Sequence, residues 1–214
     1  MLKQFYEKAL PSQGVYCVSG IEQSSKKTIN RFAETLEDVY KLVDKFKGQN
    51  LNVFVALGSF DGFSRKADNC LFFRSLFLDL DVGEDKAYGD KGEAQTALWK
   101  FLGETGLPDP VCVDSGGGLH AYWIMDRDIP IDEYLPYALK FKDFALARIS
   151  ADAVVMADAD EVPLTVPDPS VAPRRVVVTV TVAFWLEVKP VTVKGKFLPL
   201  ATPIATTPEL LAAL

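Results

Sequence analysis

Hydrophobic and polar positions along the chain form strand-like and helix-like patterns in turn. Short runs of β-prone residues predict strands over residues 14–18, 51–57, 72–81, 111–113 and 121–124. Apolar residues at helical spacing predict helices from Phe32 to Gly48, from Gly92 to Gly106 and from Tyr134 to Arg148. Because strands and helices follow one another through mixed connections, the pattern predicts an α+β fold with a largely antiparallel sheet and helices on one face.

One of these apolar runs ends in two acids, which makes it the leading candidate for a functional site. The run from Leu76 to Val82 carries Asp79 and Asp81 one residue apart. Side chains on a strand alternate between its faces, so both carboxylates lie on the same face. Neighbouring carboxylates repel unless a cation lies between them, and hard oxygen ligands favour Mg²⁺ or Mn²⁺. The pair predicts a divalent-metal site; the simpler interpretation is a strand whose last acids reach solvent.

A glycine-rich turn follows the strand predicted at 111–113. Its sequence is Asp114-Ser115-Gly116-Gly117-Gly118-Leu119-His120. Glycines permit positive φ and close approach of the backbone, so consecutive N–H groups can bind an anion such as phosphate. Ser115 and His120 add side-chain donors at the two ends. A tight hairpin would explain the glycines as well, and the histidine taken alone could be an ordinary surface or core residue.

Length, composition and charge narrow the class of protein. The chain has 214 residues and is 49% hydrophobic, which suffices for one compact unit with a sizeable core. No apolar run reaches the roughly 18 residues of a membrane span, and residues 1–8 lack a signal-peptide core, so we expect a cytoplasmic protein without a membrane partner. Three distant cysteines and one histidine predict buried, reduced thiols and no zinc site. A net charge of −6 argues against binding nucleic acid through bulk charge.

The composition changes from Val162 onward. Eight of the 13 prolines lie there, among many valines and threonines. Prolines confine strands to sheet edges, so we expect edge strands or loops, with strands at 176–182 and 184–188. We therefore divide the chain into residues 1–161 and an atypical segment, 162–214, that completes the same unit.

The acid pair and the glycine turn together resemble the archaeo-eukaryotic primase superfamily, in particular the primase-polymerase domains of phage and plasmid replication proteins. The run from Leu76 to Asp81 resembles that family's first motif, an apolar strand ending in Asp-X-Asp. The run from Ser115 to Trp123 resembles its second motif, Ser-Gly-Gly-Gly-Leu-His followed by aromatic residues. Its third motif is matched by Asp152, Val155 and Asp158, so the resemblance covers about residues 53–158.

The resemblance implies a primase-polymerase core, with an RRM-like sheet beside a small α/β lobe, that joins nucleotides on a single-stranded DNA template. It implies that two Mg²⁺ or Mn²⁺ ions are held by Asp79, Asp81 and Asp152, with Asp158 as the alternative third acid. It implies that the phosphates of an incoming NTP or dNTP are bound by Ser115, Gly116, Gly117, Gly118 and His120. Two metals clamped by acids suit in-line displacement at phosphorus. No Gly-X-X-X-X-Gly-Lys-Ser/Thr loop is present, so a helicase partner would be separate or fused.

Basic residues near the acid strand are further candidates, whereas the family's later basic residues are missing. Candidates for phosphate or template contacts are Arg65, Lys66 and Arg74, although exposed basic residues beside a loop are commonly only solvated. The family has an arginine three residues after the position of Asp158, and Glu161 stands there in this chain. Thr165 replaces a second arginine. Two phosphate-binding cations of the family are therefore absent from their expected positions.

Two alternative functions are compatible with the sequence. The run from Leu78 to Val82 also resembles the nucleophile strand of haloacid-dehalogenase-type phosphatases, in which the first Asp attacks phosphate. Against this alternative, the acid strand lies well inside the chain and the glycine turn has no role. The second alternative is a degenerate primase core that binds nucleic acid or nucleotide without catalysis. The lost arginines favour that alternative, and the three acids with His120 oppose it.

Overall fold

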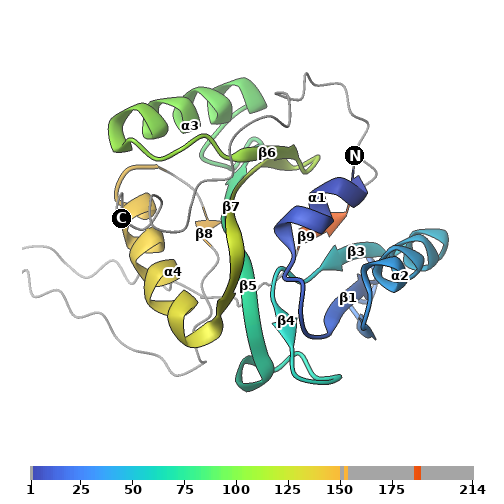
Figure 1. Ribbon diagram of the computed structural model, residues 1–214. Coiled ribbons are helices and arrows are strands. Elements are labelled where there is room, and N and C mark those ends of the chain that lie inside the picture. The colour runs from blue at the N-terminus through green and yellow to red at the C-terminus, as the bar shows by residue number, and fades with distance from the viewer. Residues whose placement is uncertain (1, 150–151, 154–185, 189–214) are drawn as a thin grey trace, which may run out of the picture.

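The computed structural model of the chain describes residues 2–149, 152–153 and 186–188. Within this part, two antiparallel sheets lie side by side with helices packed against them (Figure 1). The predicted α+β class, with a largely antiparallel sheet and a smaller lobe beside it, is confirmed. No helix in the described part of the chain has both the length and the apolar character needed to span a lipid bilayer.

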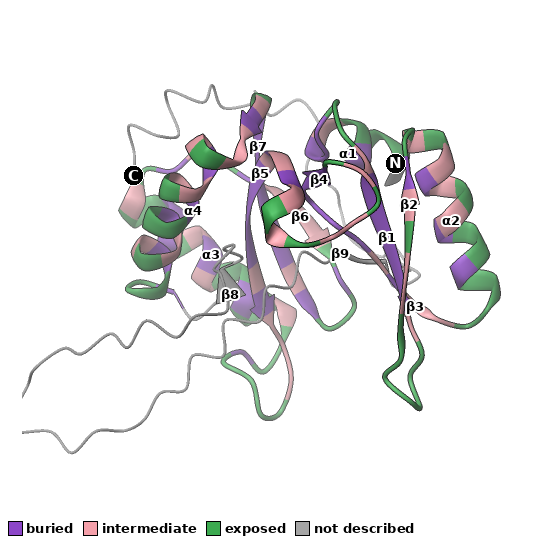
Figure 2. Ribbon diagram, turned by 90° about the horizontal axis from the view of Figure 1, so that it is seen from below, coloured by how far each residue is buried: buried purple, intermediate pink, exposed green. Residues whose placement is uncertain are grey.

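The larger sheet has five strands in the order β4-β5-β7-β6, with β8 pairing to β5. These strands are β4 (Ser59–Phe60), β5 (Cys70–Asp81), β6 (Val111–Asp114), β7 (Gly118–Pro130) and β8 (Asp152–Ala153). The short helix η1 (Ala67–Asn69) leads into β5. The pairing of β5 with β7 forms the centre of the molecule, and both strands are largely buried (Figure 2).

The smaller sheet has four strands in the order β2-β1-β3-β9. They are β1 (Tyr16–Ile21), β2 (Thr28–Ala33), β3 (Asn52–Val55) and β9 (Leu186–Val188). Helix α2 (Leu36–Gly48) packs on this sheet and begins where the Thr35 side chain accepts the N–H of Asp38 at 3.2 Å. β9 lies at the edge of the sheet, as expected for strands of the proline-rich segment, while residues 176–182 lie outside the described residues.

The two faces of the larger sheet contact different helices. Helices α3 (Lys91–Thr105) and α4 (Ile131–Leu146) lie on one side, where Trp123 of β7 packs edge-on against Phe141 of α4. Helix α1 (Leu2–Ala9) lies on the other side, where Phe5 packs edge-on against Tyr122. Because Trp123 and Tyr122 are adjacent on one strand, they point to opposite faces. Figure 1 shows the same arrangement, with α1 between the sheets.

The caps of α3 explain why its position was predictable. The Asp90 side chain accepts the N–H groups of Gly92 and Glu93 at 2.7 and 3.0 Å, which satisfies donors of the first turn. Gly106 ends the helix with φ of 69°, in the left-handed region that favours glycine. The prediction of a helix from Gly92 to Gly106 is confirmed.

The N-terminal third departs from the predicted elements at two places. Helix α1 was not predicted, although its apolar residues Phe5, Tyr6 and Ala9 follow helical spacing. The helix predicted from Phe32 begins only at Leu36, because Thr28–Ala33 forms β2. Phe32 and Leu36 are four residues apart, which fits a helix, but Phe32 packs from β2 against Phe63.

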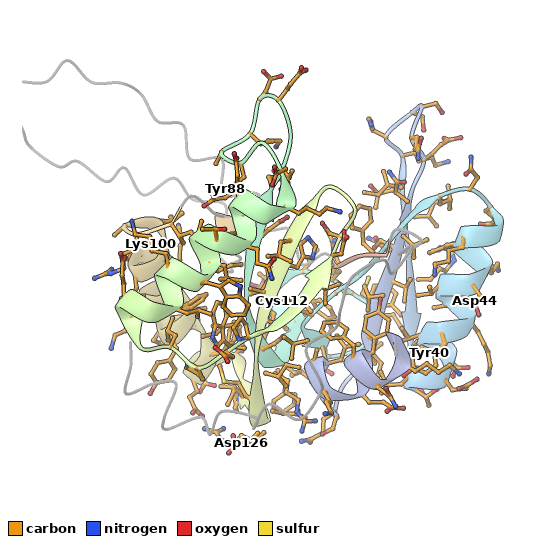
Figure 3. The ribbon with its side chains drawn as sticks, turned by 90° about the horizontal axis from the view of Figure 1, so that it is seen from above. Tyr40, Asp44, Tyr88, Lys100, Cys112 and Asp126 are labelled. Atoms are coloured by element: carbon orange, nitrogen blue, oxygen red, sulfur yellow. The ribbon has the colours of Figure 1, made fainter. Side chains whose placement is uncertain are left out.

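The cysteines and the aromatic residues after the glycine turn lie largely inside the protein. All three cysteines are free thiols; Cys17 and Cys70 are buried and Cys112 is half-buried. Tyr122 and Trp123 belong to the core, because both are almost fully buried. Tyr40 of α2, labelled in Figure 3, stacks with Tyr6 of α1, and this contact joins the two helices.

Candidate active site

The sequence-predicted acids and histidine meet in one row across the larger sheet. Asp79 on β5 lies opposite His120 on β7. On its other side Asp79 lies opposite Asp152 on β8, and His120 lies opposite Val113 on β6. Directly opposed residues of antiparallel strands share a face of the sheet. Three strands distant in sequence therefore bring positions 79, 120 and 152 together.

Alternation along β5 places the two acids on the same face. Leu78 and Leu80 are buried against the helices on the opposite face. The side chains of Asp79 and Asp81 are 30% and 41% exposed, so solvent reaches both carboxylates. The apolar run thus anchors the strand in the core, and the acids occupy its open end.

His120 is held on this face by neighbours on both sides of its ring. Its Nε2 lies 3.4 Å from Oδ1 of Asp79, and its Nδ1 lies 3.0 Å from the Tyr122 hydroxyl oxygen. The ring of Phe77 meets the imidazole edge-on, with 5.0 Å between centroids. His120 is 4% exposed, so its ring orientation is fixed by packing.

Two features of the acids fit a bound cation. Oδ1 of Asp79 is buried and accepts no hydrogen bond from any described residue, which is costly for a carboxylate oxygen. Nζ of Lys86 lies 2.6 Å from Oδ2 of Asp81, so an ammonium already pairs with the second acid. Oxygen ligands of this kind suit Mg²⁺ or Mn²⁺.

The third acid is described by its backbone alone. Among the residues whose side chains are described, no group of three His, Cys, Asp or Glu is arranged to hold a metal. Asp152 is not in that set, but its backbone pairs directly with Asp79. The alternative acid Asp158, together with Glu161 and Thr165, lies outside the described residues.

The glycine turn packs tightly against the end of β5. The N–H of Val82 donates to the carbonyl oxygen of Gly117 at 3.0 Å. A Cβ on Gly118 would lie 2.3 Å from the carbonyl oxygen of Leu80, so no other residue fits without moving the backbone. Gly116 has φ of 88°, which also favours glycine. The turn is a tight β6–β7 hairpin, and its glycines hold it against the acid strand.

Two N–H groups of the turn donate within the turn itself. Ser115 N–H donates to the Gly118 carbonyl at 3.2 Å, and Gly116 N–H donates to Oδ1 of Asp114 at 2.8 Å. The Ser115 residue is buried. The sequence had suggested consecutive N–H groups open to an anion, and these two are already used.

Two lysines that the sequence analysis did not single out lie beside the site. Lys91, the first residue of α3, places Nζ 2.6 Å from Oδ1 of Asp114. Burial raises the pKa of Asp114, but the hydrogen bonds from Lys91 and from the Gly116 N–H outweigh burial and lower that pKa overall. Lys86 lies on the loop after β5, and Figure 3 shows Tyr88 where this loop turns back towards α3. Their only sequence signal is position, within ten residues of the acid pair.

The basic residues proposed from sequence lie away from the acids. Nε of Arg74 lies 3.8 Å from Oδ1 of Asp128, and the other oxygen of Asp128 accepts both the N–H and the hydroxyl of Ser12. Five residues of strand separate Arg74 from Asp79, which is about 17 Å. Arg65 is half-buried and Lys66 is exposed, both before β5. Arg74 therefore forms its ion pair in the first half of β5, away from the acids at the end of the strand.

Comparisons with known proteins give one structural similarity. No protein-family model matches the chain, and no curated protein matches it significantly. Among solved structures, the chain is similar to the AEP domain of the cyanophage S-2L primase-polymerase (PrimPol). The two share 14% sequence identity and a TM-score of 0.45, over 67% of this chain and 73% of that chain.

Proposed function

We propose that the chain carries out template-directed nucleotidyl transfer, as a DNA primase or polymerase that uses two divalent metal ions. The observation that carries the proposal is the row of Asp79, His120 and Asp152 across three strands, with Asp81 two residues along β5. The sequence motifs of the primase superfamily fall on these positions. The buried oxygen of Asp79 that accepts no hydrogen bond from any described residue, and the ammonium beside Asp81, support a cation site.

Asp79, Asp81 and Asp152 are the proposed metal-binding residues. Bound divalent ions would activate the attacking hydroxyl and stabilise the pyrophosphate leaving group. The protein itself orients the reactants, because β5, β7 and β8 fix the spacing of the acids and the histidine. A metal bound at Asp81 would displace the Lys86 ammonium that now pairs with this acid, and the positive charge of Lys86 would stay beside the site.

The proposed nucleotide site lies at His120 and the glycine turn. The His120 side chain is almost fully buried, and its ring can donate an N–H to a phosphate oxygen. Ser115 and the glycines 116–118 shape the backbone next to it. Lys86 and Lys91 add positive charge close to this turn, which compensates for the two missing family arginines.

An incorporation assay tests the proposed function. The protein is incubated with a single-stranded template, labelled nucleotides and Mg²⁺ or Mn²⁺, with and without a primer. We expect template-dependent incorporation that requires the metal; products without a primer indicate priming, and products only with a primer indicate extension. Nucleotide and template binding without any incorporation would favour the degenerate binding module. Hydrolysis of a generic aryl phosphate would favour the phosphatase.

His120→Ala is expected to weaken nucleotide binding about tenfold or more, because a hydrogen bond to a charged phosphate is lost. Binding of single-stranded DNA should change less than about twofold, since the template is assigned to a separate surface. Separate titrations of nucleotide and single-stranded DNA check both expectations in the same variant. Equal loss for both ligands, or loss for DNA alone, would count against a phosphate role for His120.

A further inference from the structure

The Tyr122 hydroxyl is the polar group that contacts His120 from behind the site. Its oxygen lies 3.0 Å from Nδ1 of His120, and Tyr122 is fully buried. Burial is the largest cause that raises the pKa of Tyr122 well above its ordinary value, and the nearby Tyr6 and Asp79 raise this pKa further. The hydroxyl therefore keeps its proton. The Tyr6 hydroxyl is not an alternative partner, because it makes no hydrogen bond with any described residue.

The two neutral tautomers of the His120 ring differ in their interactions with the Tyr122 hydroxyl and the Asp79 carboxylate. With the proton on Nε2, the Tyr122 O–H donates to Nδ1 and the Nε2–H faces the Asp79 carboxylate oxygen at 3.4 Å. With the proton on Nδ1, the lone pair of Nε2 faces that negative oxygen, which is repulsive. In the second form the buried Tyr122 O–H also loses its acceptor. Both effects favour the proton on Nε2.

Packing keeps the two rings in this relation. Phe77 meets the His120 ring edge-on at 5.0 Å and lies 4.9 Å from the Tyr122 ring. Phe5 of α1 packs edge-on against Tyr122, again at 4.9 Å between centroids. Neither ring can turn without displacing these buried neighbours.

We propose that Tyr122 is a positioning residue whose hydroxyl donates to Nδ1 of His120 and holds the imidazole with its proton on Nε2. The Nε2–H then points at Asp79 and at the place where a substrate phosphate oxygen would lie. The position of the substrate phosphate near Nε2 rests on the proposed function. The position of the proton on Nε2 does not depend on it.

The proton position can be read directly, because His120 is the only histidine of the chain. Untagged, metal-free protein is labelled with ¹⁵N, and long-range proton–nitrogen correlations of the ring are recorded at about pH 9, where imidazoles are ordinarily neutral. We expect the wild-type signals of the form protonated on Nε2. Tyr122→Phe should add a measurable fraction of the Nδ1–H form, because Nδ1 loses its donor while the Asp79 oxygen still favours the proton on Nε2.

Tyr134→Phe is the matched control. Tyr134 is also buried, and its hydroxyl donates to the carbonyl oxygen of Ser75 at 3.0 Å, away from His120. This control variant should lose a comparable hydrogen bond and leave the histidine signals unchanged. Wild-type protein protonated on Nδ1, or an unchanged His120 spectrum in Tyr122→Phe, would overturn the proposal.

Kinetics provide the second measurement. Tyr122→Phe should raise the nucleotide KM about three- to tenfold with a smaller change in kcat, because one oriented hydrogen bond weakens. Tyr134→Phe should leave KM unchanged. An unchanged KM in Tyr122→Phe would overturn the positioning role. If neither the wild type nor the two variants incorporate nucleotides but the NMR spectra behave as expected, the proposed function is wrong. The assignment of the proton to Nε2 then still stands.

Discussion

Asp79→Asn is expected to lower nucleotide incorporation by at least about a thousandfold, because a lost metal ligand removes several kcal/mol of transition-state stabilisation. The fold should survive, since Oδ1 of Asp79 is buried without a hydrogen bond and a neutral amide costs less there than a carboxylate. The metal-free variant should therefore melt at or above the wild-type temperature. Primer-extension rates and thermal melts of the same preparations check both expectations.

Asp85→Asn is the matched control for this variant. Asp85 lies on the exposed loop that follows the acid strand, and the substitution removes the same charge a few residues away. Incorporation by the control should stay within about twofold of wild type. If Asp79→Asn retains wild-type activity, or loses no more than Asp85→Asn, Asp79 does not hold the catalytic metal.

Gly118→Ala is expected to destabilise the protein by about 2–3 kcal/mol, which corresponds to a melting temperature lower by roughly 5–10 °C. The added Cβ would lie 2.3 Å from the Leu80 carbonyl oxygen and 3.1 Å from Cα of Asp81, so β5 and β7 must separate. Because Gly118 pairs with Asp81, the same shift displaces the second acid and should abolish incorporation. Thermal melting and extension assays measure the two effects.

Gly103→Ala is the control, and it should change the folding stability in the opposite direction. Gly103 lies near the end of α3, and a Cβ there would meet nothing within 4 Å. Alanine is the better helix former, so this variant should gain about 0.5–1 kcal/mol. A melting temperature of Gly118→Ala equal to wild type would contradict the close approach of the turn to β5.

The face shared by the acids was predictable because it follows from a local rule. Period-two alternation on β5 places Asp79 and Asp81 together whatever the rest of the chain does. The caps at Asp90 and Gly106 likewise mark α3 in the sequence. Local chemistry of this kind needs no knowledge of distant contacts.

The features that the sequence analysis missed depend on contacts between distant segments or on short, ambiguous patterns. Lys86 and Lys91 acquire their place only when the loop after β5 folds beside the β6–β7 turn. Asp152, in contrast, was named from the family resemblance, and its place opposite Asp79 comes from the pairing of β8 with β5. The segment from Thr28 to Ala33 has spacing that suits a helix or a strand, and its pairing with β1 decides for a strand.

The most direct test of the metal-dependent account is a crystal structure with Mn²⁺ and a non-hydrolysable nucleotide, in which anomalous scattering locates the metal. The account predicts Mn²⁺ about 2.0–2.6 Å from carboxylate oxygens of Asp79, Asp81 and Asp152. It also predicts that Nζ of Lys86 has left its present position, 2.6 Å from Asp81. If Asp158 reaches the metal in place of Asp152, the third-acid assignment is wrong. A bound nucleotide with no Mn²⁺ at Asp79 and Asp81 would contradict the account.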